Sequence, residues 1–509
     1  MIKYFYLPLL LFVVIAIFQK IFNKSNSVNH SLSSAEALQL QNKLFYILCA
    51  LYIVIFGVLS ILRYVSLHST FCDMGIFENT IWKIAYNKDF YLISFGHFWP
   101  ILLVYALIYK IFSSGITLLL LQTIAITVGA YPLYKIAQKH LKGVFPIVIV
   151  LSYFLYFGVE YNNLFDFHPD HLFMTLLLFG FYFLEEKNIK GFMVISVLAL
   201  FIKEPLLLSL SLFGLYAGIK HKNYKEGFFI FVIAILFFIV VTQITIPFYF
   251  KGKYPFASSA ISSKFNLGFL EIIKSVILHP SSLIVELFSC KEKLIYLFCI
   301  FAPLLFVPLL SPLALLPTLP MIFIAILSQA YNYYSLQSHY SASIIPGLFV
   351  AFIYGLKKIE KVKWLAVYVV SFSIYFNVVL SSSPSSLLFW EGKDWIYSKN
   401  AYLTTNRDKM INVAIKKYIP VDSKISVTTQ NSINSGKLAK RDKYLLFPQS
   451  QDFNKSDYVI LDLKRALFAV DRTDGEKIVN DILKTRKILF EEDGFYILTK
   501  KCGLVEKDD

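Results

Sequence analysis

Long apolar blocks separated by short polar segments dominate the first 380 residues of the chain. Many of these blocks approach the roughly 20 residues that an α-helix needs to cross a bilayer, so they predict transmembrane helices. Twelve blocks qualify: residues 4–22, 44–64, 116–134, 144–159, 171–184, 192–202, 206–219, 228–247, 294–309, 312–327, 341–356 and 364–380. The pattern predicts an α-helical polytopic membrane protein with about 12 spans.

Two further stretches, residues 101–112 and 267–287, fit a crossing less well. The first is short for a span. Counting it as one would also move the lysines that follow Tyr134 to the other side of the membrane. We expect both stretches to lie along the membrane interface, where Trp82 and Trp99 suit an aromatic belt.

The pattern changes after Ser381. Short apolar runs at residues 424–429, 458–462 and 494–499 predict β-strands, and residues 406–418 and 475–487 have helical periodicity. About a third of residues 391–509 are charged, against about a ninth of those before them. We expect three parts: an N-terminal transmembrane helix with a cytoplasmic linker (1–43), a multi-span membrane domain (44–380) and a small α/β domain (381–509).

Composition supports a membrane protein. Hydrophobic residues make up 57% of the chain and charged residues 16%, whereas soluble domains carry about 25% charged residues. The net charge of +16 lies mostly in short loops between predicted spans, so it marks topology and not a nucleic-acid partner. The five cysteines are scattered without CxxC spacing, which predicts neither a zinc site nor a disulfide framework.

Five basic clusters indicate the orientation. They occupy residues 20–43, 135–142, 187–190, 220–225 and 357–363, and all fall on one side if the twelve spans alternate. Short loops rich in lysine stay in the cytoplasm. We therefore expect a multi-pass protein of the plasma (inner) membrane with residues 381–509 outside the cytoplasm.

Candidate chemistry begins just beyond the second predicted span. Ionisable residues near span ends are costly to bury and usually have a function. Asp73 could accept a proton from an attacking hydroxyl, with Glu78 and His97 as substrate contacts. Because Asp73 and Glu78 are five residues apart, they do not stack on one helical face, and we choose Asp73 as the base. A helix cap or an interfacial charge is the alternative for Asp73.

A second cluster alternates along residues 166–170. An extended segment would place Asp166, His168 and Asp170 on one side, and Pro169 favours that extended form at His168. Two carboxylates and an imidazole could bind a polar substrate or a divalent cation. Oxygen-ligand patterns are less specific than zinc motifs, so substrate contacts are the preferred interpretation and the metal a weak one.

A third cluster is the Lys203-Glu204-Pro205 turn between two apolar runs. A buried ammonium needs an anion, which could be Glu204 in a helix hairpin or the phosphate of a lipid. His339 and Tyr340, at the start of the eleventh predicted span, could add donors to the same pocket.

The motifs of these clusters, with several others, resemble those of a known family. Residues 73–82 (DMGIFENTIW), 97–100 (HFWP), Gln122 in LLLLQ, 131–134 (YPLY), 166–169 (DFHP) and Lys203-Glu204 follow in the order seen in the DUF2079 family of predicted membrane proteins. The resemblance covers about residues 60–380. Pro205 stands where we expect an acidic residue in that family.

In layout the chain is also similar to the GT-C superfamily of integral-membrane glycosyltransferases. That resemblance implies sugar transfer from a polyprenyl-phosphate donor to an acceptor, by direct displacement with inversion and with Asp73 as the base. The roles of the other candidate residues are inferred from their positions. Neither the sugar nor the acceptor is specified.

Two other classes compete with a glycosyltransferase. A transporter or lipid flippase would place its polar residues near the membrane midplane, with broken helices and repeats. A non-catalytic membrane scaffold would leave the clustered motifs unexplained. The glycosyltransferase hypothesis predicts that the first two acidic clusters, although distant in sequence, meet in one lipid-accessible outer cavity with Lys203 and His339.

Overall fold

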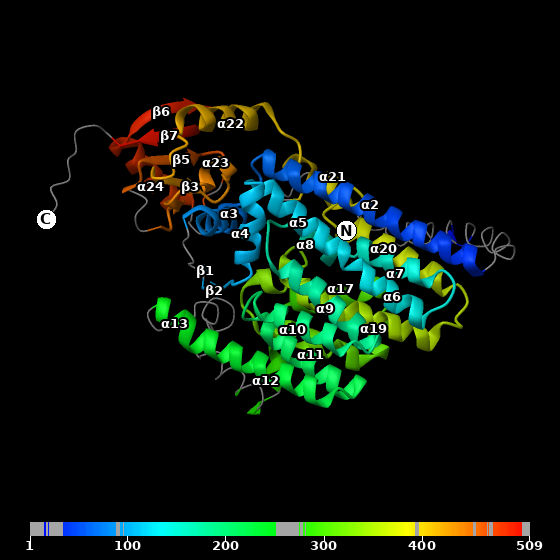
Figure 1. Cartoon of the computed structure of the whole chain (residues 1–509). Helices are drawn as coiled ribbons and strands as arrows, with labels where there is room; N and C mark the ends of the chain where they lie inside the picture. Colours follow the sequence, from blue (N-terminus) through cyan, green and yellow to red (C-terminus); the bar gives the residue numbers. More distant parts are fainter. Residues whose placement is uncertain are drawn as a thin grey trace.

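The computed structural model consists of a bundle of apolar helices with a small sheet domain at one end (Figure 1). It describes residues 34–87, 92–250 except 95, 281–391, 397–450, 455–465 and 472–500, with a few isolated positions. The predicted span at residues 4–22 falls almost entirely outside these residues, as does most of the stretch 267–287 before helix α16 (Ser281–Leu287).

The bundle helices follow one another along the chain and are joined mostly by short turns. Helical segments occupy each predicted span from residue 44 onward. They are α2 (Ser34–Val65), α5 (Gly115–Val128), α6 (Ala130–His140), α7 (Phe145–Leu155), α8 (Phe157–Leu164), α9 (Asp170–Glu185), α10 (Ile189–Leu200), α11 (Leu206–His221), α12 (Tyr224–Val240), η4 (Val241–Thr245), α13 (Ile246–Tyr249), α17 (Lys291–Phe301), α18 (Leu319–Leu327), α19 (Ile344–Ile359) and α20 (Leu365–Leu380).

Fewer helices than predicted are long enough to span a membrane by themselves. Within the described residues, four pass a test of length and hydropathy: Ala35–Val65, Gly115–His140, Tyr224–Tyr249 and His339–Ile359. A fifth passes if α7 and α8, which meet at a bend of 47°, count as one span. Other helices are short: α10 has 12 residues, about 18 Å of helix against a hydrocarbon core of about 30 Å. The count of about twelve spans is therefore not confirmed.

Prolines break two of the predicted spans. Residues 294–309 contain α17 followed by the 3-10 segments η5 (Ala302–Leu304) and η6 (Val307–Leu310), and residues 312–327 begin with η7 (Pro312–Thr318). Proline lacks the backbone N–H that an α-helix uses and its ring clashes with the preceding turn. The apolar pattern predicted helix in these segments but could not show their interruptions.

The loops that carry the basic clusters meet at the end of the bundle opposite the sheet domain (Figure 1). Gln41, near the start of α2, donates to the carbonyl of Gly143 after α6 at 2.8 Å. Glu185, at the end of α9, lies 3.8 Å from Lys139 and 3.9 Å from His221, near the ends of α6 and α11. The basic loops therefore lie at one end of the bundle, as expected if successive spans alternate in direction. The cytoplasmic location of this end is a prediction.

The orientation can be tested directly. We expect a reporter fused after Asp509 to be active outside the cytoplasm, and a cysteine introduced at Lys222 to react with an impermeant thiol reagent only from the cytoplasmic side, because lysine-rich short loops are retained there. A cytoplasmic reporter signal would reverse the orientation. A cysteine introduced at Val421, an exposed position of the sheet domain, is the matched control and should label from the outside.

The small domain after the bundle contains a five-stranded mixed sheet. Its strands are β3 (Val427–Gln430), β4 (Tyr444–Phe447), β5 (Tyr458–Asp462), β6 (Lys487–Glu492) and β7 (Phe495–Thr499), in the order β4-β3-β5-β7-β6. The pairs β4–β3 and β3–β5 are parallel, and β7 is antiparallel to both of its neighbours. The helices are α22 (Asn406–Tyr418), α23 (Gly436–Ala439) and α24 (Arg472–Thr485). Strands β4 and β6 were not predicted from the sequence.

The sheet domain shares its hydrophobic core with the segment that follows α2. Leu67, Phe71 and Ile76 pack among the domain's own buried residues. In this segment, η2 (Phe71–Gly75) leads into α3 (Ile76–Trp82) and η3 (Lys83–Asn87), and Figure 1 shows α3 beside α23. The backbone N–H of Phe71 donates to the carbonyl of Asn431, and that of Cys72 to its side-chain oxygen, both at 2.8 Å. The domain therefore fixes the position of η2.

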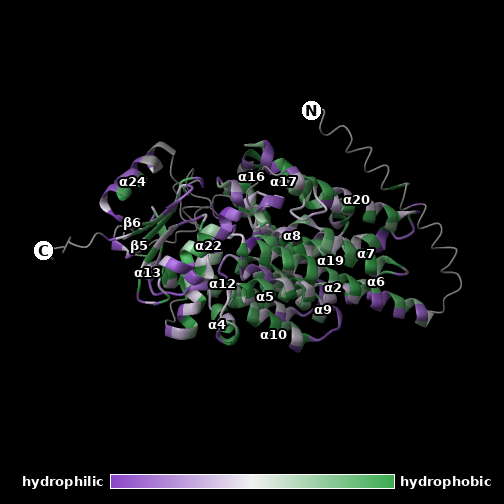
Figure 2. Cartoon of the chain, turned by 90° about the horizontal axis from the view of Figure 1, so that it is seen from above, coloured by the Kyte–Doolittle hydropathy of each residue, from purple (hydrophilic) through white to green (hydrophobic). Residues whose placement is uncertain are grey.

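Helix α4 (Leu102–Ile111) occupies the predicted interfacial stretch. Leu102 and Tyr109 are buried, whereas Leu107 and Ile111 are more than two-thirds exposed. Such an apolar outer face suits contact with lipid, and Figure 2 shows hydrophobic residues dominating the helices of the bundle. The prediction of an aromatic belt is wrong for Trp82 and Trp99, which are buried inside the protein.

Candidate functional site

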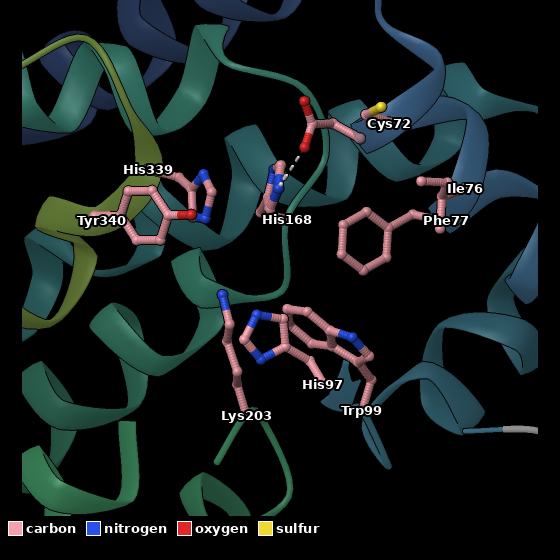
Figure 3. Close-up of a pocket in the computed structure, with 10 residues that line it drawn as sticks. Cys72, Ile76, Phe77, His97, Trp99, His168, Lys203, His339 and Tyr340 are labelled. Carbon is pink, nitrogen blue, oxygen red and sulfur yellow. Dashed lines mark ion pairs between the residues drawn. The ribbon is translucent and has the colours of Figure 1, made fainter. Parts of the chain in front are cut away.

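A pocket of about 160 Å³ opens at the end of the bundle that carries the sheet domain (Figure 3). Its walls come from five separate segments: η2–α3, the strand pair β1 (Ile93–Ser94) and β2 (His97–Phe98), the loop before α9, the turn between α10 and α11, and η9 (His339–Ser343). Each segment lies at a helix end. The lining residues are Cys72, Asp73, Ile76, Phe77, His97, Trp99, His168, Lys203, His339 and Tyr340.

The Asp73 carboxylate contacts the His168 ring in the pocket wall, with 3.2 Å between Oδ1 and Nε2. The Asp73 side chain is 26% exposed and that of His168 only 6%. Burial acts to raise the pKa of the Asp73 carboxyl. The contact with His168, the Thr70 hydroxyl and the charge of Arg63 act in the opposite direction, and the net pKa is lowered. Asp73 is therefore ionised at neutral pH.

A buried ion pair supports Asp73 from behind. The Thr70 hydroxyl lies 2.9 Å from Asp73 Oδ2 and 2.8 Å from Asp166 Oδ2, and the Thr70 backbone N–H donates to Asp166 at 2.7 Å. Asp166 Oδ1 lies 3.3 Å from the Arg63 guanidinium, and both side chains are nearly fully buried. Arg63 also donates to the Phe165 carbonyl at 2.9 Å. The end of α2 is thus fastened to the loop that precedes α9.

Gln122, in the middle of α5, holds the loop that carries His168. Its side-chain amide donates to the carbonyls of Asn162 and Asn163 at 3.1 and 3.0 Å, while its oxygen accepts from the backbone N–H of His168 at 3.0 Å. A fully buried amide satisfies three backbone groups here. The sequence signal for this role is a lone glutamine inside an apolar helix.

Two further contacts fix the orientation of the His168 ring. Its Nδ1 lies 3.2 Å from the carbonyl oxygen of Asp166. The His339 ring stacks on it, with centroids 3.8 Å apart and planes at 17°. His339 is 6% exposed, and its Nδ1 has no hydrogen-bond partner within the described residues. An unpartnered buried nitrogen in a pocket wall is a candidate ligand contact.

Lys203 reaches the pocket from the turn between α10 and α11. Its ammonium lies 3.2 Å from Asp170 Oδ1, 4.8 Å from the centre of the Trp99 ring and 5.7 Å from that of Tyr340. The Lys203 and Asp170 side chains are both more than nine-tenths buried. Carboxylate and aromatic faces together offset the cost of burying the ammonium.

Glu204 does not neutralise Lys203, so that interpretation of the Lys-Glu turn is wrong. Its carboxylate points to the neighbouring segment, where it lies 2.5 Å from His97 Nδ1 and accepts from the backbone N–H of Phe98 at 3.1 Å. Successive residues in a tight turn point in different directions, so adjacency in sequence did not produce a pair. Asp170, from another helix, is the partner of Lys203.

Most of the predicted site residues converge. Asp73, His97, His168, Lys203, His339 and Tyr340 line the pocket, and Asp166, Asp170 and Glu204 lie directly behind it as partners of lining or supporting groups. Of the two acidic clusters predicted to share one cavity, Asp73 and His168 line the pocket, whereas Asp166 and Asp170 lie behind its wall. The site roles of Arg63, Thr70 and Gln122, and the ring walls formed by Phe77 and Trp99, were not predicted from the sequence.

Glu78 lies elsewhere. Its buried carboxylate accepts from the hydroxyls of Tyr64 and Tyr109 at 2.8 and 3.0 Å, close to Gly115 and Gly436. Burial raises the pKa of Glu78 despite these hydrogen bonds. This residue joins the bundle to the sheet domain and does not contact the pocket.

The geometry does not favour the metal site considered for Asp166, His168 and Asp170. Each faces a different partner: Arg63, Asp73 and Lys203 respectively. Among all the residues that the structure describes, no three His, Cys, Asp or Glu side chains are arranged to hold a metal ion.

Comparison with known proteins identifies the family. The model of the predicted membrane proteins DUF2079 matches residues 63–491, which include the entire pocket and most of the sheet domain. The chain belongs to this family. Membership supports a location in a membrane. The family model matches more of the chain than residues 60–380, the range that contains the motifs. No curated protein and no solved structure matches the chain.

Proposed function

We propose that this DUF2079 protein is an integral-membrane glycosyltransferase that moves a sugar from a polyprenyl-phosphate donor to an acceptor hydroxyl at the extracytoplasmic face. The observation that carries the proposal is one pocket lined by an accessible carboxylate, Asp73, and a buried ammonium, Lys203. Glycosyl transfer from a phosphate needs these two charges: a base for the acceptor and a cation for the leaving group.

The remaining walls suit a sugar. Phe77, Trp99 and Tyr340 contribute ring surface, and His97 and His339 contribute ring nitrogens. Apolar and aromatic walls with a few polar groups are typical of small-molecule sites, where the polar groups set orientation. A sugar has apolar C–H faces and hydroxyl edges, and this lining offers a counterpart to both.

The position of the pocket suits a lipid-linked donor. Its lining residues lie at helix ends, and α4, which has an exposed apolar face, begins three residues after Trp99. A polyprenyl chain can lie against such a surface while its phosphate enters the polar pocket. A transporter would instead place its binding residues near the middle of the bundle, so the pocket's position at one end supports transfer over transport.

The reaction would be a single displacement. Asp73 accepts the proton of the acceptor hydroxyl as its oxygen attacks the anomeric carbon, and the bond between that carbon and the phosphate oxygen breaks. The electron pair leaves with the phosphate, whose charge Lys203 offsets. Attack opposite the leaving group inverts the anomeric configuration.

The proposal can be tested with purified full-length protein in nanodiscs and a panel of radiolabelled hexoses linked to prenyl phosphate. We expect saturable donor binding and transfer of the label to an acceptor or to water. Polyprenyl phosphate without sugar should compete for binding. An absence of donor binding across the panel would contradict the proposal.

Lys203→Ala is expected to raise the KM for the donor by roughly 10- to 100-fold, because hydrogen bonds to charged groups contribute about 1.5–3 kcal/mol. Donor binding to the purified variant measures the effect. Lys190→Ala, in the basic loop at the opposite end of the bundle, is the matched control. The double variant Lys203→Met/Asp170→Asn removes both charges of the pair and separates loss of binding from loss of folding. Unchanged donor affinity in both pocket variants would contradict a role for Lys203 in phosphate binding.

A further inference from the structure

A second cavity lies between helices α11 and α12, at the end of the bundle that carries the basic loops. The two helices pack side by side (Figure 1). The cavity has a volume of about 470 Å³, and residues of α11, among them Gly218, and Tyr224, Lys225 and Phe228 of α12 line it. Lys225 is the charged residue of an otherwise apolar lining. We call this cavity the α11–α12 groove.

Glycines shape the groove. A methyl group added at Gly214 would lie 2.5 Å from the carbonyl oxygen of Gly227, so the two helix backbones touch at this point. Small residues permit such close approach of helices in membranes. One turn nearer the connecting loop, a methyl group added at Gly218 would meet no atom closer than 3.9 Å. The helices are therefore in close contact at Gly214, and the missing side chain at Gly218 leaves space between them.

The preceding helix hairpin, α9–α10, has a similar turn but a filled interior. Its turn is Lys187-Asn188-Ile189-Lys190, and that of α11–α12 is Lys222-Asn223-Tyr224-Lys225. The first lysine of each turn has a positive φ, 55° and 59° respectively. Four residues before it stands Phe183 in one hairpin and Gly218 in the other. A methyl group added at Gly191 of α10 would lie 2.8 Å from the Phe183 ring. An aromatic ring thus occupies in α9–α10 the space that stays open in α11–α12.

The rim of the groove is apolar and open. Tyr224 and Phe228 are each 64% exposed, and Ile219 is 59% exposed. Helix α12 begins Tyr224–Tyr249, one of the four helices that pass the test of length and hydropathy for a membrane span. An aromatic residue at the first position of such a span suits the membrane interface. The groove therefore lies where an acyl chain can enter it from the lipid.

Two lysines stand at the loop end of the groove. Lys225 lines it, and Lys222 is exposed in the turn three residues earlier. Within the part of the chain that the structure describes, neither ammonium has an ion-pair partner. Lys220 is directed elsewhere, with its ammonium 5.3 Å from the centre of the Tyr354 ring. The one acidic residue of positions 220–226 is Glu226, so the charge at this end of the groove is positive.

We propose that the α11–α12 groove binds one anionic phospholipid, with an acyl chain between the helices and the headgroup phosphate at Lys222 and Lys225. Basic pockets between transmembrane helices recognise such headgroups. A second copy of the chain fits less well, because a two-fold symmetric contact would bring the two lysine pairs together. The site is separate from the proposed sugar transfer, since Lys203 precedes the other end of α11.

The headgroup contact can be tested by native mass spectrometry of the full chain, titrated with phosphatidylglycerol or with phosphatidylcholine. We expect one phosphatidylglycerol to bind more tightly than any phosphatidylcholine. Lys222→Gln/Lys225→Gln should weaken phosphatidylglycerol binding by about 25-fold, or about 5-fold for each lysine, and leave phosphatidylcholine binding unchanged.

Lys187→Gln/Lys190→Gln is the matched control, because it removes two lysines with the same spacing from the hairpin whose interior is filled. This variant should bind phosphatidylglycerol as wild type does. Equal weakening in both double variants would overturn the proposal, since it would show attraction to the basic surface in general. A dimer that phosphatidylglycerol does not dissociate would also overturn it and assign the groove to a second copy.

Gly218→Leu tests the groove itself. Leucine favours a helix, and its side chain enters the open space without a backbone clash. Phosphatidylglycerol should raise the melting temperature of wild type, because a ligand of the folded state stabilises it, and should not raise that of Gly218→Leu. Gly218→Ala adds only a methyl group and should keep the shift. A shift retained by Gly218→Leu, or an equal shift with phosphatidylcholine in wild type, would overturn the proposal. If Gly218→Leu fails to fold, the lysine variants decide.

Discussion

Asp73→Asn is expected to lower the rate of sugar transfer by about 10²- to 10⁴-fold, the usual contribution of a general base. The volume of the side chain is nearly unchanged. The new amide can donate to His168 Nε2 while its oxygen accepts from the Thr70 hydroxyl, so the contacts at 3.2 and 2.9 Å keep partners. The variant should therefore fold and bind donor, and lose only the step in which the acceptor is deprotonated.

Assays of sugar transfer and of donor binding on the same preparation show whether Asp73→Asn loses transfer while it keeps donor binding. Glu78→Gln is the matched control, because it changes a nearby carboxylate of the same segment that lies outside the pocket. Full turnover by Asp73→Asn would remove Asp73 from the mechanism and leave it as an interfacial carboxylate or a helix cap.

Arg63→Met is expected to cost about 3–5 kcal/mol of stability, the range for removing one partner of a buried ion pair. The variant leaves the Asp166 carboxylate without its cation, and both side chains are at most 3% exposed. The loss should appear as a lower melting temperature and as poor recovery of folded protein from detergent, even at neutral pH.

The double variant Arg63→Met/Asp166→Asn tests whether the unpaired Asp166 carboxylate causes the loss of stability. Removing both charges should restore most of the stability, because a neutral amide can still accept from Thr70 and is far cheaper to bury than a carboxylate. If Arg63→Met alone is as stable as wild type, Asp166 is not held by this pair. If the double variant is no better than the single, packing of the arginine stem carries the effect.

Much of the bundle could be predicted from the sequence, because apolar blocks must form helices where no water can satisfy the backbone. Several residues of the candidate site could also be predicted. Polar residues such as Asp73, His168 and Lys203 stand out against apolar neighbours, and each lies near a predicted helix end. The length of each helix was less visible, because proline and tight turns shorten helices inside continuous apolar runs.

The partners of the site residues could not be predicted. Lys203 pairs with Asp170, 33 positions away, and not with the adjacent Glu204, because side-chain direction in a turn depends on backbone angles that the residue types do not specify. Tryptophan is a residue type enriched at membrane interfaces, yet Trp99 packs against the Lys203 ammonium. Both outcomes depend on how distant segments meet.

The two hydrogen bonds from η2 to Asn431 have a consequence for evolution and engineering. The sheet domain and the segment that carries Asp73 share one core and a set of backbone contacts, so neither is a module that can be exchanged alone. A chimera that replaces only residues 397–500 would bring a foreign loop against η2 and displace the carboxylate. We therefore expect relatives that diverge in the sheet domain to vary residues 66–80 together with it, and a transplanted domain to work only when that segment is transplanted too.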